Sequence, residues 1–338
     1  MENTKDLQSS LSSNLLREKR YRSFLEKCAN HMTVKNIAHF GSKLMHQEKL
    51  HYHFFEDHSL FKNALYLTFF SLNLPYEYQD SKYLKRKISK EEAISILKLF
   101  ERRISERVPV QYITHEAYYS GYKFFVNKNV LVPRSLMNSQ FEDFLSHVHW
   151  ENYRVLDLCT GSGCIGITLA LLNPNIKVDL VDISSDALEV ASANVKYYGL
   201  QDRVRCIQSD LFTNLHDKYD LIITNPPYVP EIEYAEQPLE VKNEPKIALV
   251  AGKDGLDILH QILTQAKKYL NPNGMLIAEV GYSAAITLKK KYPKVPFQWR
   301  KCKGSKDESL LYKITEFLIQ WTPLLDSIFL CEAKGLPD

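Results

Sequence analysis

The sequence predicts an α/β fold that is preceded by a helical domain, and two observations support this. From residue 154 onward, short apolar runs that predict buried strands recur along the chain, and the first precedes a glycine turn and an apolar helix start. Before residue 115, apolar residues recur at helical spacing instead, as at Leu60, Ala64 and Leu67. We therefore expect a helical domain over residues 1–115, a β-hairpin linker over 116–134 and an α/β domain over 135–316.

Length and composition are those of a cytoplasmic protein with two domains. The 338 residues exceed the usual size of one hydrophobic core, and a hydrophobic content of 45% suffices to fill two. The polar start of the chain predicts no signal peptide, and the apolar stretch Phe317–Leu330 is broken by Pro323 and Asp326 and is too short to span a bilayer. Six cysteines without a C-x-x-C pair predict reduced thiols and no metal site.

The segment between the two domains predicts a β-hairpin. Aromatic and β-branched residues alternate with other residues at Tyr119, Tyr122, Phe124, Val126, Val130 and Val132. The turn is expected between Asn127 and Asn129, since asparagine is a common turn former. After the hairpin, Arg134 can orient the backbone of a substrate, stabilise a nearby acidic group or form an interdomain salt bridge.

A strand, a glycine turn and a helix open the α/β domain. Arg154–Leu158 predicts a buried strand, and the residues after it allow the backbone to turn sharply and approach a ligand at a helix N-terminus. The candidate cofactor-binding residues in this segment are Asp157, Thr160, Gly161, Ser162 and Gly163.

Three further strands deliver polar groups to the same edge of the predicted sheet. The second strand ends at Asp182, whose carboxylate can accept hydrogen bonds from ribose hydroxyls. The third leads to Asp210 and Leu211, which can border an adenine ring, and the fourth, Tyr219–Thr224, leads to Asn225. Because ligands of open α/β sheets bind at the carboxyl ends of the strands, these segments predict one shared site.

The glycines leave two classes of cofactor open. Gly161, Gly163 and Gly166 fit the dinucleotide pattern G-x-G-x-x-G, which makes a nicotinamide-dependent oxidoreductase a serious alternative. Asp157 stands before these glycines, where a carboxylate suits the positively charged amino-acid part of S-adenosylmethionine better than a pyrophosphate. Together with the segment described next, Asp157 favours methyl transfer.

The tetrapeptide Asn225-Pro226-Pro227-Tyr228 suits methylation of a planar nitrogen. Such a nitrogen is a poor nucleophile because its lone pair is delocalised, so the site must accept its N–H groups and hold it in place. The Asn225 side-chain oxygen and the Pro226 carbonyl can accept, and Tyr228 can pack against the planar group. Two prolines stiffen the segment. On its own the tetrapeptide could also be a simple turn.

The chain resembles the N5-glutamine methyltransferases, which methylate glutamine side-chain amides on translation proteins. The resemblance runs from about Glu101 to Trp299 and rests on these segments: Glu101–Ile104, Arg107–Tyr112, Val132–Ser135, the glycine turn, Asn225–Tyr228 and Glu279–Gly281. It implies a seven-stranded Rossmann-like class I methyltransferase domain, S-adenosylmethionine as cofactor, Asn225, Pro226 and Tyr228 as catalytic residues, and a substrate site that adds Pro227 and Arg134. It also implies a closing antiparallel strand near Leu310–Ile314.

Two branches of this family, which differ in their substrate, are candidates for this chain. The branch that methylates release factors usually carries Pro-Arg-Pro-Glu-Thr-Glu, where this chain has Pro133-Arg134-Ser135-Leu136-Met137-Asn138. The branch that methylates large-subunit ribosomal protein three is more similar, through Val132–Ser135, Asn243–Pro245, Ala251–Asp257 and Val295–Trp299. We therefore expect the ribosomal-protein branch, although residues 135–137 and the long apolar tail depart from its pattern. The tail, residues 317–338, is expected to be helical.

Charge is divided unevenly and bears on the partner. Residues 1–133 carry a net charge of +7 and the remainder −4. The basic part is compatible with contact to ribosomal RNA or an early assembly intermediate, although charge alone favours a solvated helical surface. The densest basic cluster consists of Lys82, Lys85, Arg86, Lys87 and Lys90, beside a predicted capping box at Ser89 and Glu92. An N6-adenine nucleic-acid methyltransferase and a noncatalytic assembly factor remain the alternatives.

Overall fold

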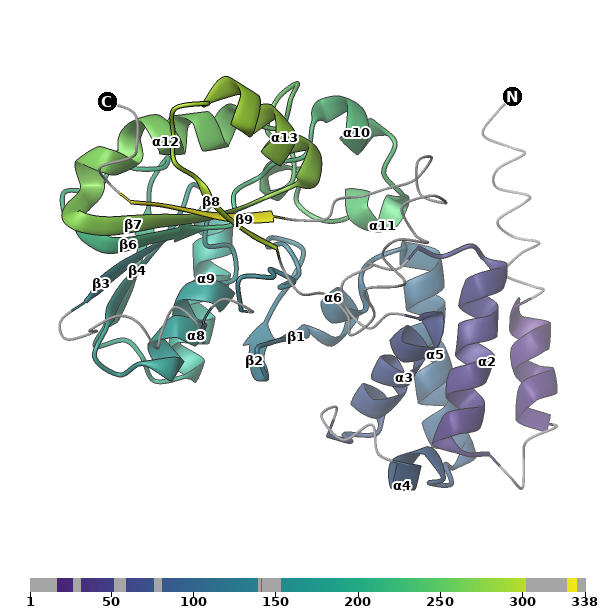
Figure 1. Ribbon diagram of the computed structural model, residues 1–338. Coiled ribbons are helices and arrows are strands. Elements are labelled where there is room, and N and C mark those ends of the chain that lie inside the picture. Colours follow the sequence, from purple (N-terminus) through teal and green to yellow (C-terminus); the bar gives the residue numbers. More distant parts are fainter. Residues whose placement is uncertain are drawn as a thin grey trace. The chain divides into compact units, whose positions relative to one another are not determined.

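The computed structural model describes residues 17–26, 32–51, 59–75, 81–138, 141, 153–301 and 327–332 (Figure 1). The chain divides into two compact units, residues 1–114 and 115–338. Among the described residues, none of the helices has the length and apolar character needed to cross a membrane.

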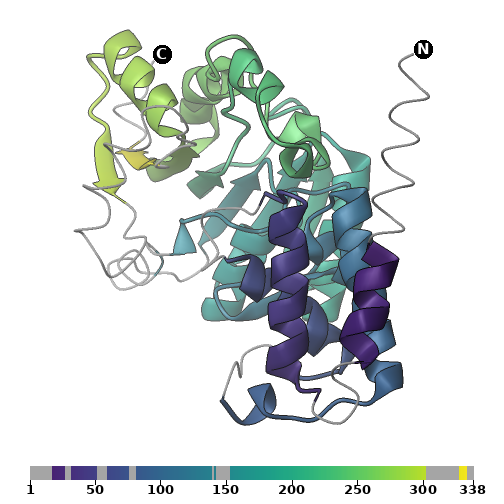
Figure 2. The ribbon, with the colours of Figure 1, turned by 90° about the vertical axis from the view of Figure 1, so that its right-hand side faces the viewer.

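The first unit is a helical bundle. Its helices are α2 (Val34–Gln47), α3 (Leu60–Ser71), α4 (Ser81–Leu84), α5 (Lys90–Glu106) and α6 (Val110–Thr114). A further helix over residues 17–26 lies beside α2, as Figures 1 and 2 both show, where Phe24 stacks on Phe40 with ring centroids 4.1 Å apart. Gly41 permits close packing of α2, because a Cβ there would lie only 2.4 Å from the Phe100 ring of α5.

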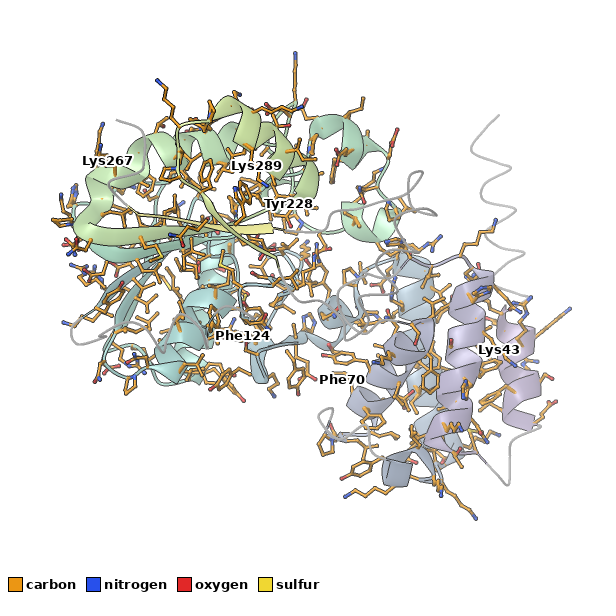
Figure 3. All side chains as sticks on the ribbon, in the orientation of Figure 1. Lys43, Phe70, Phe124, Tyr228, Lys267 and Lys289 are labelled. Carbon is orange, nitrogen blue, oxygen red and sulfur yellow. The ribbon has the colours of Figure 1, made fainter. Side chains whose placement is uncertain are left out.

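In this unit the sequence predicts the start of α5 correctly, but not the burial of every apolar residue. The predicted capping box is confirmed: Ser89 accepts a hydrogen bond from the Glu92 N–H, and the Glu92 carboxylate accepts from the Ser89 N–H. Phe70, labelled in Figure 3, is 37% exposed although its spacing places it with the apolar residues of α3, and the neighbouring Phe69 is buried instead.

The predicted β-hairpin exists, but the prediction of its turn was wrong. Its strands are β1 (Glu116–Tyr119) and β2 (Tyr122–Phe125), and they are joined by Ser120 and Gly121, both with positive φ. Such two-residue turns match the twist of the strands, and the Ser-Gly pair was the signal for it. Residues 127–129 form a separate turn, in which the Asn129 N–H donates to the Asn127 side chain.

The hairpin belongs to the second unit. Phe124, labelled in Figure 3, is fully buried with residues of the α/β core. The amide side chain of Asn194 accepts from the Phe125 N–H at 2.7 Å and donates to its carbonyl oxygen at 3.0 Å. The hairpin is therefore docked on the α/β domain.

The second unit is built on a sheet of mostly parallel strands. Its strands are β3 (Arg154–Leu158), β4 (Lys177–Asp182), β5 (Val204–Gln208), β6 (Tyr219–Thr224), β7 (Leu270–Val280), β8 (Gln298–Lys301) and β9 (Ser327–Glu332). Their order is β5-β4-β3-β6-β7-β9-β8. The first five are parallel, while β9 runs antiparallel to both neighbours. From β3 the chain first adds β4 and β5 on one side and then crosses to add β6 on the other side of β3. Ligands are expected at the carboxyl ends of β3 and β6, where the order of the strands changes in this way.

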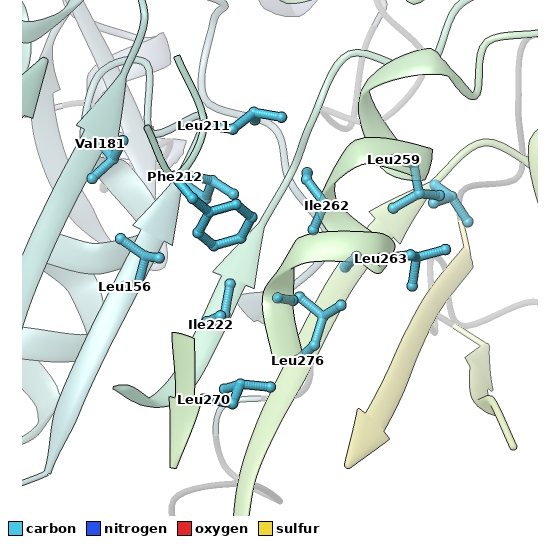
Figure 4. Packing of buried hydrophobic residues seen from close by; sticks show 14 of the residues in the cluster. Leu156, Val181, Leu211, Phe212, Ile222, Leu259, Ile262, Leu263, Leu270 and Leu276 are labelled. Atoms are coloured by element: carbon cyan, nitrogen blue, oxygen red, sulfur yellow. The ribbon is translucent and has the colours of Figure 1, made fainter. Parts of the chain in front are cut away.

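Helices cover both faces of this sheet (Figure 1). On one face, α8 (Cys164–Leu172) and α9 (Ser185–Tyr197) pack on β3, β4 and β5. On the other face lie α12 (Asp257–Tyr269) and α13 (Tyr282–Lys291). Figure 4 shows the second core, where leucines and isoleucines of α12 meet Ile222 and Leu276 of the sheet. Burial of these side chains fixes the strand ends that form the site.

The late part of the chain departs from simple sequence rules. Residues 271–274 are turn-forming types, Asn-Pro-Asn-Gly, yet β7 runs through them with a register shift against β6 between Tyr219 and Leu221. The tail was expected to be helical, but residues 327–332 form β9, in which Ile328, Phe329 and Leu330 pair with Glu279, Ala278 and Ile277 of β7. The closing strand predicted at residues 310–314 lies outside the described residues.

Candidate active site

A cavity of about 230 Å³ lies in the second unit, at the carboxyl ends of the parallel strands. Segments that follow β3, β4, β5 and β6 line it, together with a stretch after the hairpin and a 3-10 helix, η1 (Lys246–Ala248). The predicted site residues on its wall are Arg134, Thr160, Gly161, Ser162, Asp182, Asp210, Leu211, Asn225 and Pro227. The structure thus brings four separate predicted segments into one site.

Asp157 holds the glycine turn from behind. Its carboxylate is fully buried and accepts hydrogen bonds from Thr160 Oγ1 at 2.6 Å and from the Gly166 N–H at 2.9 Å. Burial raises its pKa to about 7. Its other oxygen, Oδ1, is buried with no protein hydrogen-bond partner. Asp157 is not part of the cavity wall, and its hydrogen bonds fix the glycine turn, while its contact with a cofactor stays a prediction.

Glycine is favoured at three positions in this segment for different geometric reasons. Gly161 and Gly163 have φ of 54° and 80°, a conformation that favours glycine. A Cβ at Gly161 would meet no atom within 4 Å, so its backbone faces open space on the cavity wall. At Gly166 a Cβ would lie 2.5 Å from Leu180 and 3.0 Å from Asp157, so glycine lets α8 approach the sheet.

Asp182 joins the end of β4 to the glycine turn. One carboxylate oxygen accepts from the Gly161 N–H at 2.9 Å, and the other accepts from the Ser184 N–H at 3.0 Å. Burial raises the pKa of Asp182 despite these hydrogen bonds. Each oxygen has a further lone pair, so the carboxylate can also accept from a bound hydroxyl.

The segment after β5 supplies a polar and an apolar surface. Asp210 is exposed on the cavity wall, whereas Leu211 is buried and has a φ of 47°. Sequence reasoning missed Ser209, which also lines the cavity and whose hydroxyl accepts from the Asn214 N–H at 3.0 Å. That hydrogen bond closes the turn that presents Asp210 and Leu211.

The structure separates the residues of Asn225–Tyr228 into two groups. Asn225 and Pro227 line the cavity, while Pro226 is buried. Tyr228 (Figure 3) packs against a small apolar cluster of Val229, Val241 and Leu249. Gly255, with φ of 74°, gives the Tyr228 backbone room, since a Cβ there would lie 2.3 Å from the Tyr228 carbonyl oxygen.

Arg134 is on the cavity wall but is already paired. Its Nη1 lies 2.9 Å from both carboxylate oxygens of Glu244. Both residues belong to the second unit, so the interdomain salt bridge considered for Arg134 is replaced by one within the domain. Sequence reasoning assigned no role to Glu244, which stands next to Pro245 in a segment used only for the family resemblance.

Two cysteines beside the glycine turn are poor nucleophiles. Cys159 and Cys164 both line the cavity, and burial raises the pKa of each thiol, that of Cys164 to about 12. Across the described part of the chain, no group of three or more His, Cys, Asp or Glu residues is placed to hold a metal ion. The chemistry of this wall is that of hydrogen-bond acceptors and apolar surface.

These residues fit S-adenosylmethionine. Gly161 offers an uncovered backbone, Asp182 and Asp210 offer carboxylates for hydroxyl and amino groups, and Leu211 offers an apolar surface for a ring. The buried carboxyl group of Asp157, with its unpaired Oδ1, lies behind the turn, where it suits a cationic ligand better than a pyrophosphate. The fold and this site define a class I methyltransferase.

Comparisons with known proteins narrow this class. Residues 137–239 match the family model of the methyltransferase small domain. The chain is 39% identical over 277 residues to the ribosomal protein uL3 glutamine methyltransferases of Neisseria gonorrhoeae and Neisseria meningitidis serogroup B, covering 80% of this chain and 91% and 90% of theirs. The chain belongs to the family of ribosomal protein uL3 glutamine methyltransferases. A solved methyltransferase from Pyrococcus furiosus is 15% identical, with a TM-score of 0.41 over 73% of this chain and 99% of that one.

Proposed function

We propose that this protein transfers a methyl group from S-adenosylmethionine to the side-chain amide nitrogen of a glutamine in ribosomal protein uL3. The observation that carries the proposal is that Asn225 and Pro227 share one cavity with the glycine turn and Asp182. The names of the relatives that are 39% identical supply the substrate.

Within this proposal, one side of the cavity holds the cofactor. The amino-acid end binds at Thr160, Gly161, Ser162 and Gly163, with the buried carboxyl group of Asp157 behind them. Asp182 accepts from ribose hydroxyls, and Asp210 and Leu211 border the adenine. When bound, S-adenosylmethionine supplies an electrophilic methyl group on a positively charged sulfur.

The other side of the cavity prepares the nucleophile. The Asn225 side-chain oxygen and the Pro226 carbonyl accept the two N–H groups of the glutamine amide, which orients its nitrogen and favours charge development on it. Pro227 and the packing of Tyr228 in its apolar cluster keep this turn rigid. The nitrogen would bond to the methyl carbon while the bond from that carbon to the sulfur breaks and leaves a neutral thioether, and the nitrogen would then lose one proton to water. Positioning accounts for most of the catalysis in this scheme.

The first unit is proposed to recognise the substrate in the cytoplasm, free or within an early ribosomal assembly intermediate. In its basic cluster, Lys82, Lys85, Lys87 and Lys90 are exposed, whereas Arg86 pairs with Glu92 at 2.8 Å. Exposed lysines can contact phosphates of ribosomal RNA without base specificity. The same unit would present the ribosomal protein to the seven-stranded methyltransferase domain.

Label transfer to three separate substrates tests this proposal. The purified enzyme is incubated with methyl-labelled S-adenosylmethionine and with uL3, a release factor or adenine-containing nucleic acid, and the Asn225→Ala variant serves as control. We expect label on uL3 alone, and a much lower rate of labelling with the variant. Label on the release factor instead would assign the chain to the sister branch, and label on nucleic acid would overturn the substrate class.

A further inference from the structure

Seven consecutive residues after the hairpin, 129–135, line the cavity, and the stretch from Val132 to Leu136, here called the strap, is attached at both ends. Two buried carboxylates make the attachments, Glu244 at one end and Glu279 at the other. Neither carboxylate has a part in the proposed methyl transfer. Burying a charged group is unfavourable unless it is paired or hydrogen-bonded, and the contacts with the strap contribute to compensating both carboxylates.

Glu244 attaches the first half of the strap. Its side chain is fully buried, and it accepts from the Val132 N–H at 3.1 Å as well as from Arg134 Nη1. Glu244 directly precedes Pro245 and η1, and Ile247 and Ala248 of η1 line the same cavity. This one carboxylate therefore joins two segments of the cavity wall.

The η1 segment is in turn fixed to the turn that carries Asn225. Leu249 accepts a hydrogen bond from the Val229 N–H at 2.8 Å, and Ala251 donates to the Val229 carbonyl oxygen at 3.1 Å. Val229 follows Tyr228 directly. Hydrogen bonds and short stretches of backbone thus connect Asn225–Tyr228 through η1 and Glu244 to the strap.

Glu279 attaches the other half. It accepts from Ser135 Oγ at 2.5 Å and from the Leu136 N–H at 3.1 Å. Glu279 follows Ala278, which pairs with Thr224, and Thr224 directly precedes Asn225. Both ends of the strap are therefore linked to the neighbours of the residue that we propose accepts from the glutamine amide.

We propose that Glu244 and Glu279 are positioning residues, which hold the strap beside Asn225 and so shape the opening for the glutamine side chain of the substrate. This inference rests on the proposed function. Arg134 acts here by neutralising Glu244, so it contributes to the wall of the site and not to a contact with the substrate backbone. Loss of either carboxylate would let the strap shift relative to Asn225.

Steady-state kinetics with uL3 test the inference. Glu244→Gln and Glu279→Gln keep the size of the side chain but remove its charge, and we expect kcat/KM for uL3 to fall on the order of tenfold to a hundredfold, as for a small misplacement in an active site. Affinity for S-adenosylmethionine, measured by calorimetry, is expected to stay within about twofold. Glu236→Gln, the same change at an exposed position near α10 (Glu231–Ala235), should leave both unchanged.

A double variant separates positioning from a general loss of structure. Arg134→Gln removes the guanidinium that neutralises the buried Glu244 carboxylate. Adding Glu244→Gln removes the negative charge as well, so the double variant should be no worse than Arg134→Gln alone. Additive losses in kcat/KM would overturn the pairing, and unchanged kinetics in both glutamine variants would overturn the positioning role.

Amide hydrogen exchange tests the attachment independently of any substrate. The N–H groups of Val132 and Leu136 donate to Glu244 and Glu279, respectively. Their exchange should accelerate in Glu244→Ala and Glu279→Ala, each at its own end of the strap. Unchanged exchange at both ends would overturn the inference. If the wild-type enzyme did not methylate uL3 while this exchange pattern held, the proposed function would fail and the strap attachment would stand.

Discussion

Thr224 Oγ1 donates a hydrogen bond to the carbonyl oxygen of Leu158 at 2.7 Å, and so joins the last residues of the two central strands. Leu158 leads into the glycine turn and Thr224 leads into Asn225. Both residues are fully buried, so this hydrogen bond is shielded from water. It sets the distance between the segment proposed to hold the cofactor and the segment proposed to hold the glutamine amide.

Removing this hydrogen bond should weaken stability and catalysis together. Thr224→Val keeps the shape but leaves the Leu158 carbonyl without this donor, so the free energy of unfolding should fall by about 1 kcal/mol. Urea denaturation and kcat would be measured, with Thr224→Ser as a control that retains the hydroxyl. A valine variant with unchanged kcat would show that the distance between the two turns tolerates change.

Asn225→Ala should abolish most turnover and spare cofactor binding. The change removes an acceptor from the amide nitrogen and should lower kcat about a hundredfold, by analogy with the loss of one preorganised group in other active sites. Calorimetry should give an affinity for S-adenosylmethionine within a small factor of wild type. Asn175→Ala, at an exposed position near the opposite end of β4, is the matched control. Loss of cofactor binding would assign Asn225 to the cofactor site.

Asp182→Ala should have the reverse effect. The variant loses the proposed ribose acceptor and also the acceptor for the Gly161 N–H, so affinity for S-adenosylmethionine should fall at least about tenfold. The fall in kcat at saturating cofactor should be much smaller. The exposed Asp202 provides the control Asp202→Ala. Normal affinity in the Asp182 variant would refute the ribose assignment.

Asp157 should make the protein less stable as pH rises. Burial raises its pKa to about 7 in the folded state, whereas an unfolded aspartate has a pKa of about 3.9. Between these values the folded state binds more protons, so the free energy of unfolding should decrease from about pH 4 to pH 7. Asp157→Asn should reduce this slope, and Asp182, whose pKa is also raised, should retain part of it. Urea denaturation across this pH range measures the slope for both proteins. An identical slope in the variant would contradict this prediction.

Two glycine variants should fail for different reasons. Gly166→Ala forces a methyl group against Leu180 and Asp157, and should destabilise by about 1 to 3 kcal/mol. Gly161→Ala strains a positive φ, at about 1 to 2 kcal/mol, and also places its methyl group in the open space of the cavity wall. Only the second should lower affinity for S-adenosylmethionine well beyond its effect on stability. Equal affinities in the two variants would argue against cofactor contact at Gly161.

The parts of the fold that sequence predicts are those that depend on local chemistry. The buried strand Arg154–Leu158, the glycine turn after it and the Ser89 capping box follow from residue types and their spacing. The hairpin turn was misplaced because Asn127 and Asn129 are stronger turn formers than Ser120. The strand at residues 327–332 was missed because its stability comes from pairing with β7, a contact that no local pattern encodes.

The site divides in the same way. Residues at strand ends, such as Asp182 and Asn225, could be grouped from sequence because parallel strands end at one edge of a sheet. The pairing of Arg134 with Glu244 could not, since 110 residues separate them and only the packed fold brings them together. The same holds for Ser135 and Glu279, which are 144 residues apart.

Tandem mass spectrometry of uL3 after reaction with the enzyme is the most direct test of the central claim. It locates the transferred methyl group on a particular side chain and atom. We expect one methyl group on the side-chain nitrogen of a glutamine after reaction with the wild-type enzyme, and a much smaller modified fraction after the same time with Asn225→Ala. A methyl group on a lysine, an arginine or a carboxylate of uL3 would contradict the claim that Asn225 prepares a glutamine amide.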